Sequence, residues 1–255
     1  MTSSTTSPQF APDIPARFGS GQAVKRIEDE GLLKGLGRYT DDIQPVGQAR
    51  LYFVRSPYPH ARIVAIDTAA AKAMPGVLSV VTGAELVAAG VKPIPGSPNF
   101  KRAGGAPGAS PARRVLAHER VRHVGEAVAL VVAETLQQAK NAAEAVVVDY
   151  DELPNVVDLT AALSTGAPVL CDEAPDNIAA EMRHGNATAT AEAFAKAAHT
   201  VKLRVVNQRV AALTIEPRSV LAWVAEDGRL TLNMSSQMPS GVKNSLCNDI
   251  LGLPR

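Results

Sequence analysis

Short apolar runs alternate with alanine-rich segments between residues 49 and 150. Four runs are rich in β-branched or aromatic residues and are typical of strands: 51–55, 61–67, 77–82 and 146–150. The run at 127–133 is apolar at nearly every position, which predicts a strand buried on both faces. Helices are predicted after Thr68, from 84 to 89, and after Thr135. Strands and helices joined by short connections predict helices packed on a sheet.

The second half of the chain has weaker periodicity. Residues 92–114 are rich in proline, glycine and basic residues, which predicts a long surface loop. Residues 151–186 have the composition of a connector with one helical patch at 159–163. We expect five elements after it: a helix at 189–198, a strand at 199–210, a hairpin formed by 219–225 and 229–233, and a helix at 239–251.

Composition excludes several classes of protein. The 255 residues include 26 Lys+Arg and 25 Asp+Glu, and a net charge of +1 argues against a nucleic-acid-binding protein. No apolar run reaches the roughly 18 residues of a membrane span. Two cysteines do not form a disulfide framework, so we expect a reducing cytoplasm. The Ser/Thr/Pro-rich residues 1–15 lack the pattern of a secretory signal and predict a mobile arm, or alternatively a strap that orders against a partner.

Candidate chemistry is sparse. The glycine clusters at 19–21 and 31–37 follow no apolar strand, so tight turns are favoured over nucleotide binding. None of the five histidines has zinc-like spacing to other ligands, and we predict no metal site. Cys171 precedes Asp172-Glu173, carboxylates that raise rather than lower the pKa of a thiol. Glu216-Pro217-Arg218 is a polar cluster within apolar β-like sequence, and it predicts either a structural ion pair or part of a site wall. By itself the sequence indicates a two-part α/β protein without a self-contained active site.

Several longer phrases are more specific. In order they are 37–43 (GRYTDDI), 51–63 (LYFVRSPYPHARI), 74–77 (MPGV), 80–83 (VVTG), 121–129 (VRHVGEAVA) and 148–154 (VDYDELP). With this order and spacing the chain closely resembles the large, molybdopterin-binding subunit of the xanthine dehydrogenase/aldehyde oxidase/carbon monoxide dehydrogenase family, the molybdenum hydroxylases. The resemblance runs from about Gly19 to Arg255.

The resemblance implies an α+β fold. Residues 1–19 would be an arm, 20–155 an a/b hammerhead domain, 156–185 a connector and 186–255 the incomplete start of the first molybdenum-cofactor-binding domain. The family's later cofactor loops and its catalytic glutamate have no counterpart in these residues, so the chain resembles the N-terminal third of such a subunit, from a truncation or a split gene. We therefore expect no catalytic residue and no activity from this chain alone.

The resemblance also implies cofactors and partners. The complete enzyme would oxidise an aldehyde, an N-heterocycle or a similar small substrate with oxygen from water, using a molybdenum–molybdopterin cytosine dinucleotide. An iron–sulfur small subunit, an FAD-binding medium subunit and the rest of the large subunit would be its partners.

The resemblance also implies roles for single residues. Gln208 is the candidate hydrogen-bond donor to an oxo ligand of molybdenum, or alternatively a sheet-edge residue bonded to backbone. Glu216 is the candidate to hold Arg218 or a loop amide beside the cofactor. Arg55 and Arg62 are interpreted as domain-packing or intersubunit residues, or as solvent-exposed strand ends. The alternative function is a non-catalytic assembly module.

Overall fold

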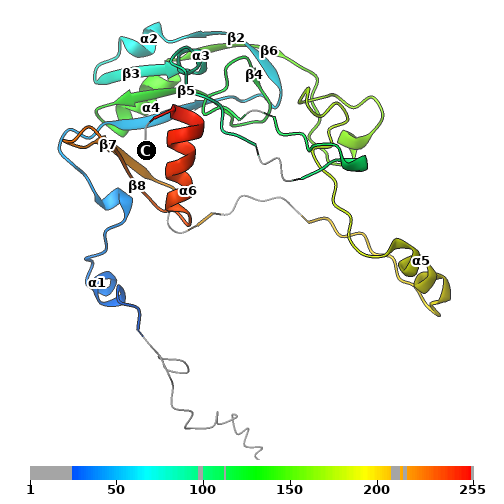
Figure 1. Cartoon of the computed structure of the whole chain (residues 1–255). Helices are drawn as coiled ribbons and strands as arrows, with labels where there is room; N and C mark the ends of the chain where they lie inside the picture. Colours follow the sequence, from blue (N-terminus) through cyan, green and yellow to red (C-terminus); the bar gives the residue numbers. More distant parts are fainter. Residues whose placement is uncertain (1–24, 97–99, 112, 208–212, 215–216, 254–255) are drawn as a thin grey trace, which may run out of the picture. The chain divides into compact units, whose positions relative to one another are not determined.

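The computed structural model describes residues 25–96, 100–111, 113–207, 213–214 and 217–253. The chain divides into two units. Figure 1 labels the helices and strands of both. The larger comprises Pro45–Pro217 and Ser235–Arg255, and the smaller comprises Met1–Gln44 and Arg218–Met234. No helix in the described ranges is both long and apolar enough to cross a lipid bilayer. The expected domain limits at 19, 155 and 185 stay predictions.

The first sheet of the larger unit has three antiparallel strands in the order β1-β5-β3. The strands are β1 (Arg50–Arg55), β5 (Ala127–Ala133) and β3 (Val77–Thr82). The central strand β5 has buried residues on both of its faces, with Val128, Ala129, Val131 and Ala133 all at 0% exposure. The prediction of a strand buried on both sides is therefore confirmed, and its cause is pairing on both edges together with helix packing.

The second sheet has the order β4-β2-β6, again antiparallel. Strand β2 (Ala61–Asp67) pairs along most of its length with β6 (Val147–Glu152), and the register shifts between Ile63 and Ala65. On its other edge β2 pairs with β4 (Arg120–Val121), which is only two residues long. Because β4 is so short, that edge of β2 is paired only at its start.

Three helices belong to these sheets: α2 (Ala69–Lys72), α3 (Gly83–Ala88) and α4 (Leu136–Glu144). Thr82 and Thr135 cap α3 and α4 through their hydroxyl oxygens, which accept hydrogen bonds from the backbone N–H of Glu85 and Gln138. Thr68 makes no such bond. Instead, the Asp67 carboxylate accepts a hydrogen bond from the Ala69 N–H at 2.9 Å. Helix α2 starts directly after Thr68, as predicted, although the side chain that binds its first turn is that of Asp67.

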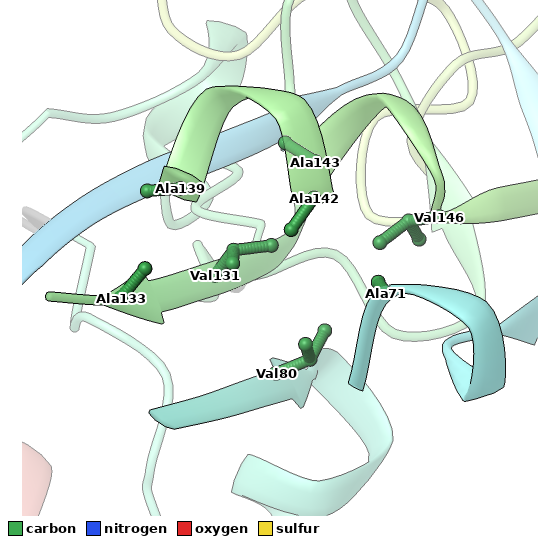
Figure 2. Close-up of a cluster of buried hydrophobic side chains, with 8 residues drawn as sticks. All are labelled: Ala71, Val80, Val131, Ala133, Ala139, Ala142, Ala143 and Val146. Atoms are coloured by element: carbon green, nitrogen blue, oxygen red, sulfur yellow. The ribbon is translucent and has the colours of Figure 1, made fainter. Parts of the chain in front are cut away.

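The main core lies between α4 and the first sheet (Figure 2). Its buried residues are alanines and valines: Ala71, Val80, Val131, Ala133, Ala139, Ala142, Ala143 and Val146. The alanines of α4 carry no side chain beyond Cβ, so the helix backbone lies close to the valines of the sheet. A second cluster of Ala61, Ala117, Val121 and Val128 joins the second sheet to β5.

In its described part, the segment 92–114 forms a loop, as predicted, with a 3-10 turn, η3 (Ala103–Gly105), and isolated bridges such as that between Ile94 and Arg113. The connector contains η4 (Ala161–Leu163). Asn177 links several of its loops. The Asn177 side-chain amide donates hydrogen bonds to the carbonyls of Ala162 and Pro168 and accepts one from the Leu170 N–H. Its backbone has a φ of 58°.

The remaining elements are more exposed. Helix α5 (Ala187–Lys196) has no buried residue, and α6 (Pro239–Asn244) continues into η5 (Ser245–Leu251), a π-helix that ends at Gly252 with φ 65°. The predicted strand at 199–210 is wrong for its described part, because residues 199–207 lie in no strand. The alternating apolar residues there have no neighbouring strand to pair with, and Val201 is 92% exposed.

The smaller unit contains α1 (Asp29–Leu33), a 3-10 turn η2 (Thr40–Asp42) and a hairpin of β7 (Val220–Val224) and β8 (Leu230–Met234). The hairpin was predicted and α1 was not, since its glycine-rich sequence favours turns. Cross-strand pairs place six apolar residues on one hairpin face: Val220, Ala222, Val224, Leu230, Leu232 and Met234. All six are exposed in the structure.

Candidate functional site

The two predicted cofactor-binding residues, Gln208 and Glu216, lie outside the described residues, so their roles stay predictions. The same holds for the proposed ion pair between Glu216 and Arg218. The described neighbours Asn207 and Arg218 are both exposed. Downstream, the Ser236 hydroxyl accepts a hydrogen bond from the Met238 N–H at 3.1 Å, which forms a turn before α6.

Residues 187–253 do not, in their described part, enclose a molybdenum–pterin group. Only Leu221 and Ile250 are buried in this stretch. No group of three or more His, Cys, Asp or Glu side chains that would hold a metal ion occurs within the described ranges. A bound molybdopterin requires converging hydrogen-bond donors and an enclosed cavity. The described residues alone therefore do not fit this cofactor.

The described residues do form a polar cavity in the larger unit, with a volume of about 810 Å³. Residues 62–66 of β2 form one wall, and Ala117–Arg120 of the adjoining segment and β4 form another. Charged side chains from separate parts of the chain complete the lining: Arg114, Arg122, Glu126, Asp172 and Glu173. The fold brings these residues together because the connector passes beside β4, where the Arg122 Nε donates to the Leu170 carbonyl at 3.2 Å.

The charges in this cavity are only partly paired. Arg120 Nη1 lies 3.8 Å from the Asp172 carboxylate. Glu126 accepts a hydrogen bond of 2.6 Å from the Arg122 backbone N–H and lies 3.6 Å from His123. Arg62 and Arg114 form no ion pair with any described residue. Glu119 and Glu173 line the cavity as well, so that four arginines face four carboxylates there and the formal charges of the lining balance.

Two histidines near this region have a buried ring nitrogen without a hydrogen-bond partner among the described residues: His60 Nε2 and His118 Nδ1. His60 is 4% exposed, and its Nδ1 lies 2.7 Å from the Pro154 carbonyl, which only accepts, so Nδ1 carries the proton. The His60 carbonyl accepts from the Leu153 N–H, which ties the start of β2 to the end of β6. His60 is thus a structural residue that joins two strands.

Cys171 is not an activated nucleophile. Burial is the main cause that raises the pKa of its thiol. Arg122 acts in the opposite direction, while the carboxylates of Glu173 and Asp172 raise the pKa further. The predicted direction is therefore confirmed, although burial contributes more than the neighbouring charges. A thiol with a raised pKa is a weak nucleophile at neutral pH.

Two family models match the chain in succession. The model for the a/b hammerhead domain of aldehyde oxidase and xanthine dehydrogenase matches residues 34–154, and the model for a molybdopterin cofactor-binding domain matches residues 170–255. The two sheets and α4 lie within the first match. The exposed α5, the hairpin, α6 and η5 lie within the second.

Curated relatives and solved structures agree with these matches. The chain is 39% identical over 93% of its length to the nicotine 6-hydroxylase large subunit of Paenarthrobacter nicotinovorans, and 33% identical over 98% of its length to the carbon monoxide dehydrogenase large chain of Afipia carboxidovorans. Its structure superposes on quinoline 2-oxidoreductase from Pseudomonas putida 86 with a TM-score of 0.81 and 34% identity, over 91% of this chain and 28% of that chain. The chain spans 28% and 31% of the two curated relatives.

Sequence reasoning missed the cavity beside β2. Its lining arginines, at 62, 114, 120 and 122, lie in separate segments, and only the fold shows that they converge. The one signal in the sequence was Arg62, which was interpreted as a packing or intersubunit residue. Arg55, interpreted in the same way, donates to the Gly125 carbonyl at 2.8 Å and lies over the Phe53 ring. Neither contact tests an intersubunit role.

Proposed function

Since this chain belongs to the family of xanthine dehydrogenases, aldehyde oxidases and carbon monoxide dehydrogenases, we propose that it works as part of the molybdopterin-binding large subunit of a molybdenum hydroxylase. The observation that carries the proposal is the succession of the two family matches, hammerhead first and cofactor-binding domain second. The substrate would be an aldehyde, an N-heterocycle or a similar small molecule, with water as the oxygen source. The named relatives act on nicotine, carbon monoxide and quinoline.

The two parts of the chain would contribute differently. The hammerhead part has two hydrophobic clusters and supplies a rigid scaffold. The cofactor-binding part has a hairpin face on which all six apolar residues are exposed. Exposed apolar surface of this kind is usual where further protein packs. It supports the proposal that residues 186–255 complete their fold together with additional polypeptide of the large subunit.

The molybdenum–pterin group supplies the redox chemistry when it is bound. We propose the cytosine dinucleotide form of this cofactor. Gln208 would donate a hydrogen bond toward it, because an amide donates without changing its own charge. Glu216 would orient Arg218 or a loop amide beside it. Neither residue transfers a proton to substrate in this proposal, and the catalytic residues would come from other parts of the subunit.

Two partner subunits follow from the proposal, an iron–sulfur small subunit and an FAD-binding medium subunit. The carbon monoxide dehydrogenase relative is named as a large chain and the nicotine relative as a large subunit, which supports a multi-subunit complex. We place this complex in the cytoplasm. The free state of Cys171 and Cys247 supports that location.

Affinity purification of the tagged chain from its native host tests the function. We expect two further subunits to co-purify, with flavin and iron–sulfur absorbance, and dye reduction with nicotine, quinoline or benzaldehyde. Deletion of the gene should abolish that activity, and re-expression should restore it. Unchanged activity in the deletion strain, or a purified chain without partner subunits, would overturn the proposal.

A further inference from the structure

We propose that Asp227, in the turn of the β7–β8 hairpin, is a site of spontaneous conversion to isoaspartate, and that Arg229 is the residue that suppresses this reaction in the folded chain. The chemistry needs only water, so neither the molybdenum cofactor nor a partner subunit takes part in it. The inference therefore goes beyond the proposed function and can fail independently of it.

The sequence sets this aspartate apart from the others. Asp227-Gly228 is the one Asp-Gly pair in the 255 residues, and the sequence contains no Asn-Gly pair. Glycine has no Cβ, so the peptide nitrogen that follows Asp227 is open to a close approach by the aspartate side chain. Every other aspartate precedes a residue whose side chain hinders the same approach.

The reaction balances without an oxidant or a reductant. The Gly228 nitrogen attacks the side-chain carboxyl carbon of Asp227, a C–N bond forms, and a carboxyl oxygen leaves as water together with the amide proton. The product is a five-membered succinimide. A second water opens this ring at either carbonyl, which restores aspartate or leaves isoaspartate. A carboxylate is a poor electrophile, so the protonated form of Asp227 is the one that reacts.

The turn restrains the nitrogen that would attack. The Gly228 N–H donates to the Ala225 carbonyl at 2.9 Å, and the Ala225 N–H donates to the Arg229 carbonyl at 2.8 Å. Gly228 has a φ of 82°, and the whole pattern is that of a type I turn followed by a left-handed glycine. The Gly228 nitrogen is thus held in the hairpin for as long as the turn stays closed.

Arg229 restrains the carboxyl group, because it engages both of its oxygens. The Arg229 backbone N–H donates to Oδ1 of Asp227 at 3.1 Å, and Nε donates to Oδ2 at 2.6 Å. The Arg229 Nη2 lies 2.5 Å from the same Oδ2. The hydrogen bond from the Arg229 side chain is the main cause that lowers the pKa of Asp227, so the carboxyl stays in its unreactive, ionised form.

Conversion would change the hairpin itself. Isoaspartate adds one carbon to the main chain between Ala225 and Arg229, and the two backbone hydrogen bonds of the turn span this stretch. The neighbouring cross-strand pair of Val224 and Leu230 would therefore lose its register. The side chains of Asp227 and Arg229 are 49% and 82% exposed, so water reaches the site directly.

Uptake of oxygen-18 from water tests the site on the full chain. Opening of a succinimide places one solvent oxygen in the residue, so incubation in H₂¹⁸O at pH 7.5 adds two mass units to the tryptic peptide that contains Asp227. Electron-transfer dissociation then distinguishes aspartate from isoaspartate. In the chain unfolded in urea, we expect Asp227 to take up the label faster than any other aspartate. In the folded chain, the uptake at Asp227 should be slower than in urea.

The substitution Arg229→Ala provides the second arm. It should speed uptake at Asp227 in the folded chain about threefold, since it removes the side-chain half of an exposed ion pair. Arg183→Ala is the matched control, because Arg183 likewise pairs with a carboxylate two positions earlier, Glu181, and it should leave the rate at Asp227 unchanged. In urea the Arg229→Ala chain and the unaltered chain should take up label at equal rates.

Several results would overturn the inference. Uptake at Asp227 no faster than at the other aspartates of the unfolded chain would remove the site. An unchanged rate in folded Arg229→Ala, or an equal rise in Arg183→Ala, would remove the role of Arg229.

If Arg229→Ala opens the hairpin, as judged by amide hydrogen exchange in β7 and β8, salt decides on the unaltered chain. Sodium chloride at about 1 M screens the exposed ion pair and should speed uptake at Asp227 in the folded chain but not in urea. A folded chain whose uptake does not respond to salt would then refute the role of Arg229.

Discussion

The core between α4 and β5 gives a quantitative prediction through Val131. This residue is at 0% exposure in the central strand of the first sheet, where its cross-strand partners are Tyr52 and Val80. Figure 2 shows Val131 and Val80 in the core. Val131→Ala removes two methyl groups, which costs about 1.6 kcal/mol at about 0.8 kcal/mol per buried carbon. The cavity left beside the alanines of α4 adds about 1 kcal/mol, because a helix held by small residues cannot collapse further. The expected loss of unfolding free energy is therefore about 2–3 kcal/mol.

Chemical denaturation followed by circular dichroism measures this loss, and thermal unfolding should show a lower Tm by about 5–10 °C. Val147→Ala is the matched control, since it makes the same change in a strand at a position that is 64% exposed. We expect its effect to stay within about 0.5 kcal/mol. Equal losses from the two substitutions would refute the assignment of this core.

Three further predictions concern other parts of the chain. The hydrogen bond from the Thr82 backbone N–H is the main cause that lowers the pKa of Glu85. The ionised Glu85 side chain therefore stabilises the fold at pH values above its unfolded pKa of about 4.3, and this stabilisation is lost as the pH falls through the folded pKa. Glu85→Gln should thus cost less than about 1 kcal/mol at pH 7 for this half-exposed group. Urea titrations of the two proteins should converge as the pH falls through the folded pKa of Glu85, and a difference that does not change with pH would contradict this. In a Cys247→Ser chain, iodoacetamide should alkylate Cys171 more slowly at pH 8 than it alkylates N-acetylcysteinamide, because burial raises the pKa of the thiol; a faster rate would disprove that. Asn177→Ala should speed amide hydrogen exchange in the connector more than Asn177→Gly does. The reason is that alanine pays about 1 kcal/mol more than glycine to adopt the left-handed φ of 58°. Faster exchange in the glycine variant would argue against this backbone conformation at residue 177.

Local sequence signals located most of the hammerhead elements. The predicted strand 61–67 has the same limits as β2, and the predicted strand 77–82 the same limits as β3. The reason is that proline and glycine breakers flank β-branched runs in this part of the chain, so that each boundary is encoded by a few neighbouring residues. Strand β4 was not predicted because two residues, Arg120 and Val121, are too few to show any period.

Features that depend on distant partners were not predictable in the same way. The alternating residues Val201, Leu203 and Val205 have the pattern of a strand, yet a strand forms only where a neighbour supplies hydrogen bonds. The cavity beside β2 is lined by arginines that are up to 60 residues apart in the sequence, Arg62 to Arg122. The cofactor residues Gln208 and Glu216 rest on resemblance alone and stay predictions.

The central claim is that this chain holds only part of a molybdenum-cofactor site, which is completed by the rest of the large subunit. Molybdenum content tests it most directly, measured by inductively coupled plasma mass spectrometry on the chain purified alone and on the complex captured from its native host. We expect about one molybdenum and one cytidine nucleotide per chain in the complex, and none on the isolated chain. An isolated chain that carries stoichiometric molybdenum and oxidises an aldehyde or an N-heterocycle without partners would contradict it.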